Sequence, residues 1–364
     1  MRVLVLNAGS SSLKGSLVEE PGDSTLDRLK LVPPSQEGWT DALRQAVIAA
    51  GRLDAVGHRV VHGGDRHRRP LLIDSSVIAE LDALRDLAPL HNRPALEVIA
   101  AAQEALPDLP HVACFDTGFH ATLEPAAYVY PLPYDWHERW GLRRYGFHGL
   151  SVAWSVERAA ALLERPVESL RLVVAHLGSG CSVTAVDGGR SVDTSMGMTP
   201  LEGLMMATRP GSVDPGMLLE ILDNGWMELS DLARALRHES GLLGVSGVSP
   251  DHRDVEEAAA EGNRRAVLAL EIFVRRAAAA IGAAATSLPA LDAVVFTGGI
   301  GEHAGECRAA ICGRLGLLGL PSVLAPEETD QDAVLSLPGA RVAVLRVSAR
   351  EDLVIAREVY RLLA

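Results

Sequence analysis

Five charged or titratable side chains lie where apolar runs end or beside glycines, in short segments of unusual composition. They are Arg59 in "GHRVVHGG", Asp116 in "FDTGFH", His148 in "RRYGFHG", Arg209 in "TRPGSVDPG" and Glu351 in "ARED". Arginine keeps its charge at physiological pH, and its planar donors match carboxylate and phosphate oxygens. Histidine can donate a hydrogen bond to an oxygen that gains negative charge. These residue types fit a site for anions, although singly Asp116 could cap a turn and His148 could be a core histidine.

Three segments rich in small residues could bring main-chain amides close to a ligand. They are residues 7–12, 176–182 and 298–303. Glycine and serine let the backbone approach a bound group, and successive N–H groups can turn inward to hold an anion. Each segment could equally be a tight turn. The sequence "GGIGEH" is not the GxGxxG pattern, and no GxxxxGK[ST] occurs, so neither a Rossmann site nor a P-loop is predicted.

The overall composition restricts the classes of partner. The 364 residues carry a formal net charge of −13, which argues against a broad nucleic-acid surface, and Lys14 and Lys30 are the only lysines in the sequence. No apolar run suggests a membrane span, and no secretory signal is visible. The four cysteines form neither a CxxC pair nor a zinc spacing: Cys114, Cys181, Cys307 and Cys312. We therefore expect a cytoplasmic protein with no nucleic-acid or membrane partner.

The elements that must position these residues follow from hydrophobic periodicity. Apolar runs predict strands at residues 3–6, 15–18, 55–61, 112–115, 172–175, 182–186, 293–297 and 342–347. Helical periodicity covers residues 75–106, 151–163, 217–224, 230–239 and 254–287, the last with a break near Gly262. Strands mixed with helices at this spacing indicate an α/β protein.

One pattern occurs twice. Residues 170–197, "LRLVVAHLGSGCSVTAVDGGRSVDTSMG", repeat the opening of the chain: an apolar strand, a tip of small residues and a second strand. Two copies indicate duplicated domains rather than a solenoid. We expect an N-terminal domain of residues 1–117, completed by residues 353–364, and a C-terminal domain of residues 118–352. Two similar domains would leave a central cleft between them, where ligands commonly bind.

Seven segments of the chain occur in an order that is typical of one family: "NAGSSSLK", "GHRVVHGG", "FDTGFH", "RRYGFHG", "TSMGMTPLEGL", "TRPGSVDPG" and "FTGGIGEH". Through them nearly the whole chain resembles the acetate kinase family. The resemblance implies the duplicated fold of actin, hexokinases and the large heat-shock chaperones, with the nucleotide bound by the second domain. It also implies reversible transfer of a phosphoryl group from ATP to a short carboxylate, dependent on Mg²⁺ or Mn²⁺, and a homodimer.

The resemblance also implies roles for residues at the motif positions. Those implied to be catalytic are Asp116, His148 and Arg209, and those implied to bind the metal are Asn7 and Glu351. The carboxylate substrate would contact Arg59 and an apolar pocket of Val61, Leu90, Phe147 and Pro200. The nucleotide would contact Ser10, Ser12, Lys14, His176, Leu177, Gly178, Ser179, Gly180, Asp251, His252, Arg253, Gly299, Ile300, Gly301, Glu302 and His303.

The chemistry of the residues agrees with these roles. A carboxylate nucleophile is already ionised at neutral pH, since carboxyl pKa values lie near about 4, so the reaction needs no strong base. It needs two anions held in line and charge neutralised on the transferring group, a task that suits Arg59 and Arg209. We therefore expect Asp116 to orient the arginines or the metal shell rather than to abstract a proton.

The sequence leaves three alternatives open. A pocket wall separates substrates that differ by one methylene by only about 1–3 kcal/mol, so propionate could replace acetate. Ser179, His303 and Arg350 stand where the family usually has asparagine, and Val152 stands where it has histidine, which leaves the phosphoryl donor open. A non-catalytic nucleotide-binding sensor of the same fold is the third, because a fold alone does not give a function.

Overall fold

The computed structural model describes residues 1–8, 13–22, 25–34, 36–84, 89–321 and 331–364, and of residues 30 and 89–91 it describes only the main chain. These residues pack as two units. Unit 1 comprises Met1–Ala121, Phe147–Trp154 and Arg350–Ala364, and unit 2 comprises Thr122–Gly146 and Ser155–Ala349. Of the helices described, none combines the length and the apolar character that crossing a membrane requires.

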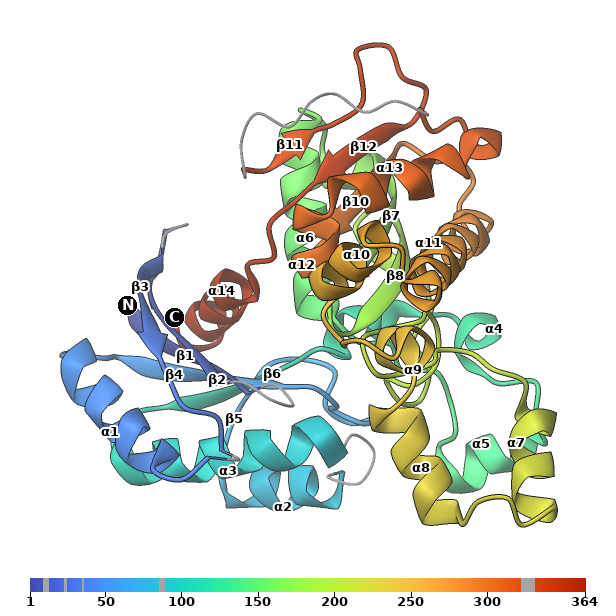
Figure 1. The fold of residues 1–364 in the computed structure, drawn as a ribbon. Coiled ribbons are helices and arrows are strands. Elements are labelled where there is room, and N and C mark those ends of the chain that lie inside the picture. The colour runs from blue at the N-terminus through green and yellow to red at the C-terminus, as the bar shows by residue number, and fades with distance from the viewer. Residues whose placement is uncertain (9–12, 23–24, 35, 85–88, 322–330) are drawn as a thin grey trace. The chain divides into compact units, whose positions relative to one another are not determined.

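Unit 1 is built on a mixed sheet, which has six strands in the described part of the chain (Figure 1). The strands are β1 (Arg2–Ala8), β2 (Leu13–Glu19), β3 (Thr25–Lys30), β4 (Ala55–Val60), β5 (Leu71–Leu72) and β6 (His111–Phe115). Their order is β3-β2-β1-β4-β6-β5, and β1, β4 and β6 are parallel. The carboxyl ends of parallel strands meet at one edge of a sheet, where α/β proteins commonly bind ligands. Asn7, Arg59 and Asp116 lie at or directly after these ends.

Helices cover both faces of the unit 1 sheet. They are α1 (Trp39–Ala50), α2 (Ser75–Ala83), α3 (Pro89–Ala105) and α14 (Glu351–Leu363). On one face, Leu4 and Leu6 of β1 join a buried cluster with Leu43 of α1 and Val98 of α3. The helix α14 lies on the other face, where it packs on β1 and β4 (Figure 1). It approaches closely because position 57 of β4 is glycine: a Cβ there would lie 2.6 Å from Cγ2 of Ile355.

Unit 2 repeats the topology of unit 1. Its strands are β7 (Arg171–Leu177), β8 (Cys181–Asp187), β9 (Arg190–Thr194), β10 (Ala293–Thr297), β11 (Ala333–Val334) and β12 (Ala343–Arg346). Their order is β11-β12-β10-β7-β8-β9, with β7, β10 and β12 parallel. In each unit the first strand pairs with an antiparallel strand on one side (β2 or β8) and with a parallel strand on the other (β4 or β10). This equivalence confirms the duplicated α/β fold that the sequence repeat predicts.

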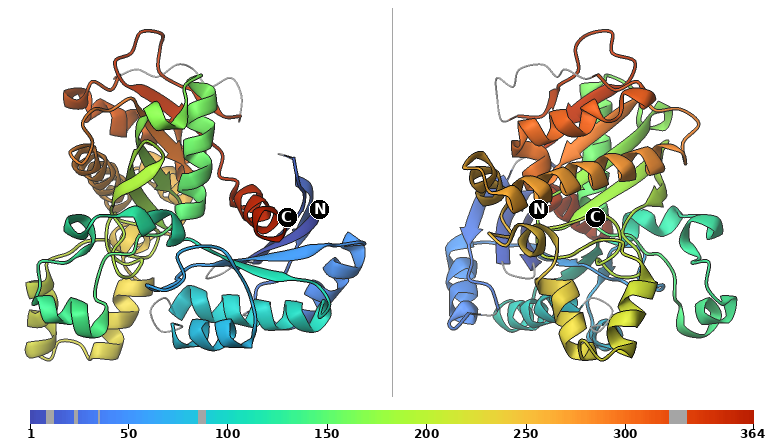
Figure 2. Two further views of the ribbon diagram at one scale, coloured as in Figure 1. Left: turned by 180° about the vertical axis from the view of Figure 1, so that it is seen from behind. Right: turned by 45° about the vertical axis from the view of Figure 1, so that its right-hand side comes forward.

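The helices of unit 2 pack on its sheet and on one another. The helix α11 (Arg264–Ala285) lies across β7 and β8 and buries Phe273, Ala277 and Ile281 (Figure 2). The remaining helices among the residues that the structure describes are α4 (Pro125–Tyr128), α5 (Tyr134–Trp140), α6 (Gly149–Leu162), α7 (Pro215–Asp223), α8 (Leu229–His238), α9 (Gly241–Ser246), α10 (His252–Ala260), α12 (Gly298–His303) and α13 (Gly305–Gly313). Short 3₁₀ turns occur at Gly118–Thr122, Val167–Ser169 and Gly316–Leu318.

Two long helices expected from the sequence are each divided in the structure. The break near Gly262 is confirmed, since α10 ends before it and the Asn263 side chain caps the start of α11. The single helix expected over residues 75–106 is wrong, because α2 and α3 are separate and α3 begins at Pro89. Proline is favoured at the first helical position, which fits the start of α3 at Pro89.

Candidate active site

The side chains of Arg59 and Asp116 form a buried ion pair between neighbouring strands. Arg59 lies in β4, and Asp116 directly follows β6, the parallel neighbour of β4. Nε of Arg59 donates to Oδ1 of Asp116 at 2.9 Å, and Nη2 donates to Oδ2 at 2.5 Å. The Arg59 side chain is 14% exposed and that of Asp116 is 1% exposed. Two parallel hydrogen bonds at this depth fix the plane of the guanidinium group.

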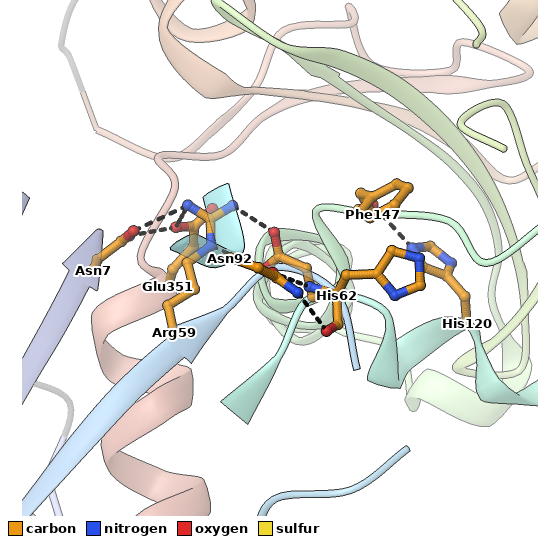
Figure 3. A network of polar contacts seen from close by, with 8 residues as sticks. Asn7, Arg59, His62, Asn92, His120, Phe147 and Glu351 are labelled. Atoms are coloured by element: carbon orange, nitrogen blue, oxygen red, sulfur yellow. Dashed lines mark hydrogen bonds and ion pairs between the residues drawn. The ribbon is translucent and has the colours of Figure 1, made fainter. Parts of the chain in front are cut away.

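The remaining guanidinium nitrogen, Nη1, faces Asn7 and Glu351 (Figure 3). It donates to Oδ1 of Asn7 at 3.0 Å and lies 3.3 Å from Oε2 of Glu351. Nδ2 of Asn7 donates to the same Oε2 at 2.8 Å. Glu351 is the first residue of α14, where the helix dipole favours a negative charge. We call Asn7, Arg59, Asp116 and Glu351 the Arg59 network.

Burial and charge act together on the Arg59 network. Burial raises the pKa of Asp116 above its ordinary value, and the charge of Arg59 offsets part of that rise. Burial alone would lower the pKa of Arg59, but the negative charges of Asp116 and Glu351 outweigh it and raise the pKa. Arg59 therefore carries its positive charge at neutral pH. Its orientation is fixed before any ligand binds, which is how a preorganised anion site works.

The segment that carries His148 lies directly against Asp116. The N–H of Gly149 donates to the main-chain oxygen of Asp116 at 2.9 Å, and a Cβ on Gly149 would lie 2.1 Å from that oxygen. The N–H of His148 donates to the Asp116 carboxyl group. His148 has a φ of 59°, a left-handed conformation that is uncommon outside glycine and that concentrates at functional sites. The backbone thus places His148 beside Asp116.

A second polar group fixes the chain that follows Arg59, and the sequence reasoning missed it (Figure 3). Asn92 of α3 accepts from the N–H of His62 through Oδ1 at 3.1 Å, and its Nδ2 donates to the carbonyl of His62 at 3.1 Å. Both main-chain groups of residue 62 are therefore satisfied by one buried amide side chain. The second histidine of "GHRVVHGG" was the signal that could have pointed to this group.

Two of the four residues expected to form the apolar pocket are buried in this part of unit 1. Val61 is 3% exposed and directly precedes His62, whose ring meets Phe147 edge-on with centroids 5.4 Å apart. Phe147 is held in turn by Nε2 of His120, which donates to its carbonyl at 3.0 Å (Figure 3). Pro200 belongs to unit 2. The side chain of Leu90 lies outside the described residues.

In unit 2, two of the predicted glycine segments come together at the ends of parallel strands. The tip after β7 and the start of α12 after β10 are so close that a Cβ on Gly178 would lie 3.7 Å from N of Gly299. Gly298 has a φ of 77°, and a Cβ on it would lie 2.8 Å from the carbonyl oxygen of Leu177. Residues 298–303 form a helical turn rather than the open loop that the sequence suggests.

These segments contain most residues expected to bind the nucleotide: His176, Leu177, Gly178, Ser179, Gly180, Gly299, Ile300, Gly301, Glu302 and His303. Within them, Oε1 of Glu302 accepts from the N–H of Ala349 at 3.0 Å, and Nη1 of buried Arg308 donates to the carbonyl of Gly301 at 2.7 Å. Three further residues expected to contact the nucleotide lie near the start of the chain. Lys14 is exposed on β2 opposite Asn7, whereas Ser10 and Ser12 lie outside the described residues.

Residues 251–253, also expected near the nucleotide, begin α10. Oδ1 of Asp251 accepts from the N–H of Arg253 at 2.9 Å and caps the helix. Hydrogen bonds from the Arg253 side chain and backbone lower the pKa of Asp251 to about 2. His252 is buried, 5.5 Å from Phe273 between ring centroids, with Nδ1 3.3 Å from Oε2 of Glu256. Asp251 and Arg253 are the more exposed members of this segment.

Arg209 lies in a turn of unit 2 that is bonded to the tip after β7. Its Nη1 donates to the carbonyl of Pro200 at 2.8 Å, and the N–H of Ala207 donates to the carbonyl of Ser179 at 3.2 Å. Burial lowers the pKa of Arg209 below its ordinary value. A partly buried guanidinium gains from binding an anion, since opposite charge restores what desolvation removes.

The donor set of the Arg59 network fits one class of metal. Asn7 and Glu351 supply amide and carboxylate oxygens, and hard cations such as Mg²⁺ prefer oxygen ligands. In the described part of the chain, no three His, Cys, Asp or Glu side chains form a metal-binding group. Magnesium commonly uses one or two protein oxygens and keeps waters or phosphate oxygens as its other ligands, so two residues are sufficient.

Comparison with known proteins agrees with this geometry. The family model described as "Acetokinase family" matches residues 39–357. The acetate kinase of Geobacillus kaustophilus is 40% identical over 99% of this chain and 99% of its own length. The crystal structure of Porphyromonas gingivalis acetate kinase covers 100% of both chains with a TM-score of 0.89 and 35% identity. A propionate kinase from Francisella tularensis reaches the same TM-score and identity over 98% of both chains.

Proposed function

The chain belongs to the acetokinase family, and from this premise we propose how its residues carry out the reaction. The activity is that of an acetate kinase: reversible transfer of the γ-phosphoryl group of ATP to acetate, giving acetyl phosphate and ADP. An acetate oxygen attacks the γ-phosphorus, a new P–O bond forms, and the bond from that phosphorus to the β,γ-bridging oxygen breaks. The electron pair of the broken bond leaves with ADP.

The reaction requires positive charge and alignment of its two anionic substrates, and it does not require a base. Acetate is ionised at neutral pH, so no proton has to be removed from the nucleophile. We propose that Arg59 draws the carboxylate and the γ-phosphoryl oxygens together, and that Asp116 keeps the guanidinium in place through its two hydrogen bonds. The observation that carries this proposal is the Arg59 network, in which Asp116 and Asn7 hold the guanidinium from both edges.

Unit 2 supplies the second positive group. Arg209 is held by the Pro200 carbonyl, and we propose that its charge stabilises an equatorial oxygen of the transferring phosphoryl group. His148, whose backbone is held against Asp116, donates to another such oxygen in our proposal. The tip after β7 and the first turn of α12 bind the nucleotide, with Asp251 and Arg253 at the start of α10. These assignments rest on the position of each residue and on the family motifs.

A divalent cation is required by kinases of this family, and we propose that it is Mg²⁺, with Mn²⁺ able to replace it. Asn7 and Glu351 would hold it through their oxygens. When bound, the cation would neutralise charge on the nucleotide phosphates and thereby lower the barrier to transfer. The Asn7 amide oxygen now accepts from Arg59, so metal binding and the hydrogen bond to Arg59 use the same atom.

The acyl group of the substrate would lie against Val61, Phe147, Leu90 and Pro200. We propose acetate as the preferred acid, because the relatives that this chain matches over nearly its full length are named acetate kinases. Propionate is the second candidate, because this chain is as similar in fold to the propionate kinase of Francisella tularensis as to the acetate kinase of Porphyromonas gingivalis.

We also propose that the enzyme is a cytoplasmic homodimer. A cytoplasmic location agrees with the use of ATP and with four cysteines that are all unpaired thiols. Exposed apolar side chains gather along α7, α8 and the turn between them, where Leu219 is 61%, Trp226 71% and Leu229 69% exposed. Such a patch is typical of an interface, and we assign it to a second copy of the chain. Light scattering after gel filtration should give the mass of two chains, and Trp226→Glu should yield one.

One assay tests the central proposal. The purified enzyme is incubated with ATP, Mg²⁺, hydroxylamine and acetate, propionate or butyrate, and the hydroxamate formed by trapping the acyl phosphate is measured. We expect product with acetate, less with propionate and little with butyrate. Absence of hydroxamate with every acid, together with normal nucleotide binding, would instead favour a non-catalytic sensor. Formation of hydroxamate with pyrophosphate but not with ATP would identify a different phosphoryl donor.

A further inference from the structure

A carboxylate of unit 2 that no motif reasoning singles out joins three separate segments of the chain. Oε1 of Glu202 accepts from Nη2 of Arg144 at 2.8 Å, and Oε2 accepts from the hydroxyl of Tyr130. Tyr130 follows α4, Arg144 lies in "RRYGFHG" and Glu202 lies in "TPLEG". Burial, with the hydrogen bond to Glu202, raises the pKa of Tyr130, so its hydroxyl stays protonated and donates to the carboxylate. We call these three residues the Glu202 cluster.

The Glu202 cluster binds the main chain just before residue 200. Nη1 of Arg144 donates to the carbonyls of Thr194 and Ser195, at 3.0 Å each. The hydroxyl of Tyr130 accepts from the N–H of Met198 at 2.9 Å. Residues 194–198 are therefore fixed by side chains that converge on a single carboxylate.

At Gly197, between Ser195 and Met198, the main chain has no room for a side chain. A Cβ on Gly197 would lie 1.7 Å from Oε2 of Glu202 and 2.0 Å from the hydroxyl oxygen of Tyr130. Glu202 itself stands at the other end of the turn, so the turn of residues 198–202 is held at both ends. Pro200, in its middle, has no N–H and donates no main-chain hydrogen bond.

The carbonyl of Pro200 is the group that holds Arg209. Nη1 of Arg209 donates to it at 2.8 Å. This oxygen belongs to the turn of residues 198–202, and the Glu202 cluster contacts that turn at Met198 and at Glu202 itself. A chain of direct contacts therefore runs from Glu202 through the turn to the guanidinium group.

We propose that Tyr130, Arg144 and Glu202 are positioning residues for phosphoryl transfer, which set the place of the Arg209 guanidinium through the Pro200 carbonyl. The inference rests on the proposed role of Arg209 and adds residues that act through it. None of the three side chains needs to touch a substrate. A displacement of about 1 Å in a group that stabilises a transition state can lower a rate about 10²-fold, so loss of the cluster should act on kcat.

A double-mutant cycle on the full-length enzyme tests the proposal. Glu202→Ala should lower kcat by about 10–100-fold, while the KM for ATP changes by less than about twofold. Arg209→Ala should lower kcat by at least about 10²-fold. In the Arg209→Ala background, adding Glu202→Ala should lower kcat by less than about twofold further, because the group through which Glu202 acts is already gone.

Two other outcomes of this cycle would overturn the proposal, and they can be distinguished from each other. If Arg209→Ala retains nearly normal kcat, the proposed role of Arg209 fails, and the role of the Glu202 cluster fails with it. If Arg209→Ala is slow but Glu202→Ala lowers kcat by the same factor in both backgrounds, Glu202 acts independently and the positioning role alone is overturned. Thermal unfolding of all variants separates loss of fold from loss of rate. Should Glu202→Ala not fold, Tyr130→Phe enters the same cycle, because it removes one hydroxyl and keeps the ring.

A matched control comes from the same unit. Asp292 forms an ion pair with Arg165 at 2.7 Å and is 23% exposed, a burial comparable to the 31% of Glu202. It directly precedes β10, at the strand end opposite the one that leads into α12. Asp292→Asn should lower stability without changing kcat. Glu202→Gln, which keeps the shape and the hydrogen bond from Arg144, should recover most of the rate lost in Glu202→Ala.

Discussion

Asn7 and Glu351 are 344 positions apart in the sequence, yet Nδ2 of Asn7 donates to Oε2 of Glu351 at 2.8 Å. The contact exists because α14 packs on β1 and β4, so that the first strand and the last helix of the chain belong to one unit. The guanidinium of Arg59 bonds to the Asn7 amide and lies beside the Glu351 carboxylate. Groups from the two ends of the chain therefore meet at one permanent positive charge.

The first prediction concerns the metal at this pair. Glu351→Ala should raise the Mg²⁺ concentration needed for half-maximal rate by at least about tenfold, because a charged oxygen ligand is lost. The rate is measured against free Mg²⁺ at saturating ATP and acetate. Glu358→Ala, on the same helix, removes a carboxylate that pairs with Arg361 at the surface and should leave the metal requirement unchanged. Full activity of the wild type in excess chelator would contradict the assignment.

The second prediction concerns the guanidinium itself. Arg59→Ala should lower kcat/KM by at least about 10²-fold, the scale of losing a preorganised transition-state donor. Arg59→Lys should recover little, because an ammonium group cannot make two parallel hydrogen bonds to Asp116 while facing Asn7. Arg44→Ala, which breaks an exposed pair with Glu104, should leave kcat/KM unchanged. Turnover close to normal in Arg59→Ala would remove Arg59 from the mechanism.

Whether a strand or helix could be predicted from the sequence depended on how deeply its side chains are buried and on its length. The fully buried strand β10 spans Ala293–Thr297, the residues that the apolar run predicts. Strand β3 was missed because its side chains are mostly exposed and give no apolar run. Strands β5 and β11 have two residues each, too few for any period to show. Helix α14 was missed despite a clear signal, since its buried residues Leu353, Ile355, Ala356 and Val359 follow helical spacing.

Some contacts of the candidate site could also be predicted from the sequence, and others could not. Arg59 and Asp116 could be predicted as neighbours because Arg59 lies near the carboxyl end of one apolar run and Asp116 directly follows another, and parallel strands bring such ends together. The role of Asn92 could not be predicted. A single asparagine in a helical segment gives no sign that its side-chain amide will bond to the main-chain N–H and carbonyl of His62. The pairing of Asn7 with Glu351 came from the family motifs alone. Local patterns do not encode which distant helix will cover a strand.

The third prediction concerns pH and stability. Burial lowers the pKa of His120 to about 4 in the folded state, against 6.5 for the free side chain. Above pH 6.5 both states are neutral; as the pH falls toward 4, the unfolded state binds a proton that the folded state does not, so stability is lost. Urea unfolding between pH 7 and pH 4 measures the loss. His120→Gln keeps a donor for the Phe147 carbonyl and should reduce the proton uptake on unfolding by about one. An unchanged pH dependence in this variant would show that His120 is not the titrating group.

The last prediction concerns the length of the acid. Val61→Ala should shift the ratio of kcat/KM for propionate over acetate in favour of propionate, by no more than about 1–3 kcal/mol, since the added methylene then has space. Val61 is 3% exposed and is followed by His62, which contacts Phe147. The measurement is kcat/KM for acetate, propionate and butyrate on wild type and variant.

Val60→Ala is the matched control for this variant, because it removes the same two methyl groups from the neighbouring position. Val60 is 2% exposed and packs in a different place, the cluster of Ile73, Leu81, Ile99 and Phe115. Both variants should lose stability by about 1–3 kcal/mol, the cost of a small cavity, but only Val61→Ala should change the acid preference. Equal ratios in both variants would place Val61 outside the pocket. If the wild-type enzyme prefers propionate, propionate replaces acetate as the proposed substrate. The proposed roles of Arg59 and Arg209 in phosphoryl transfer are then unchanged.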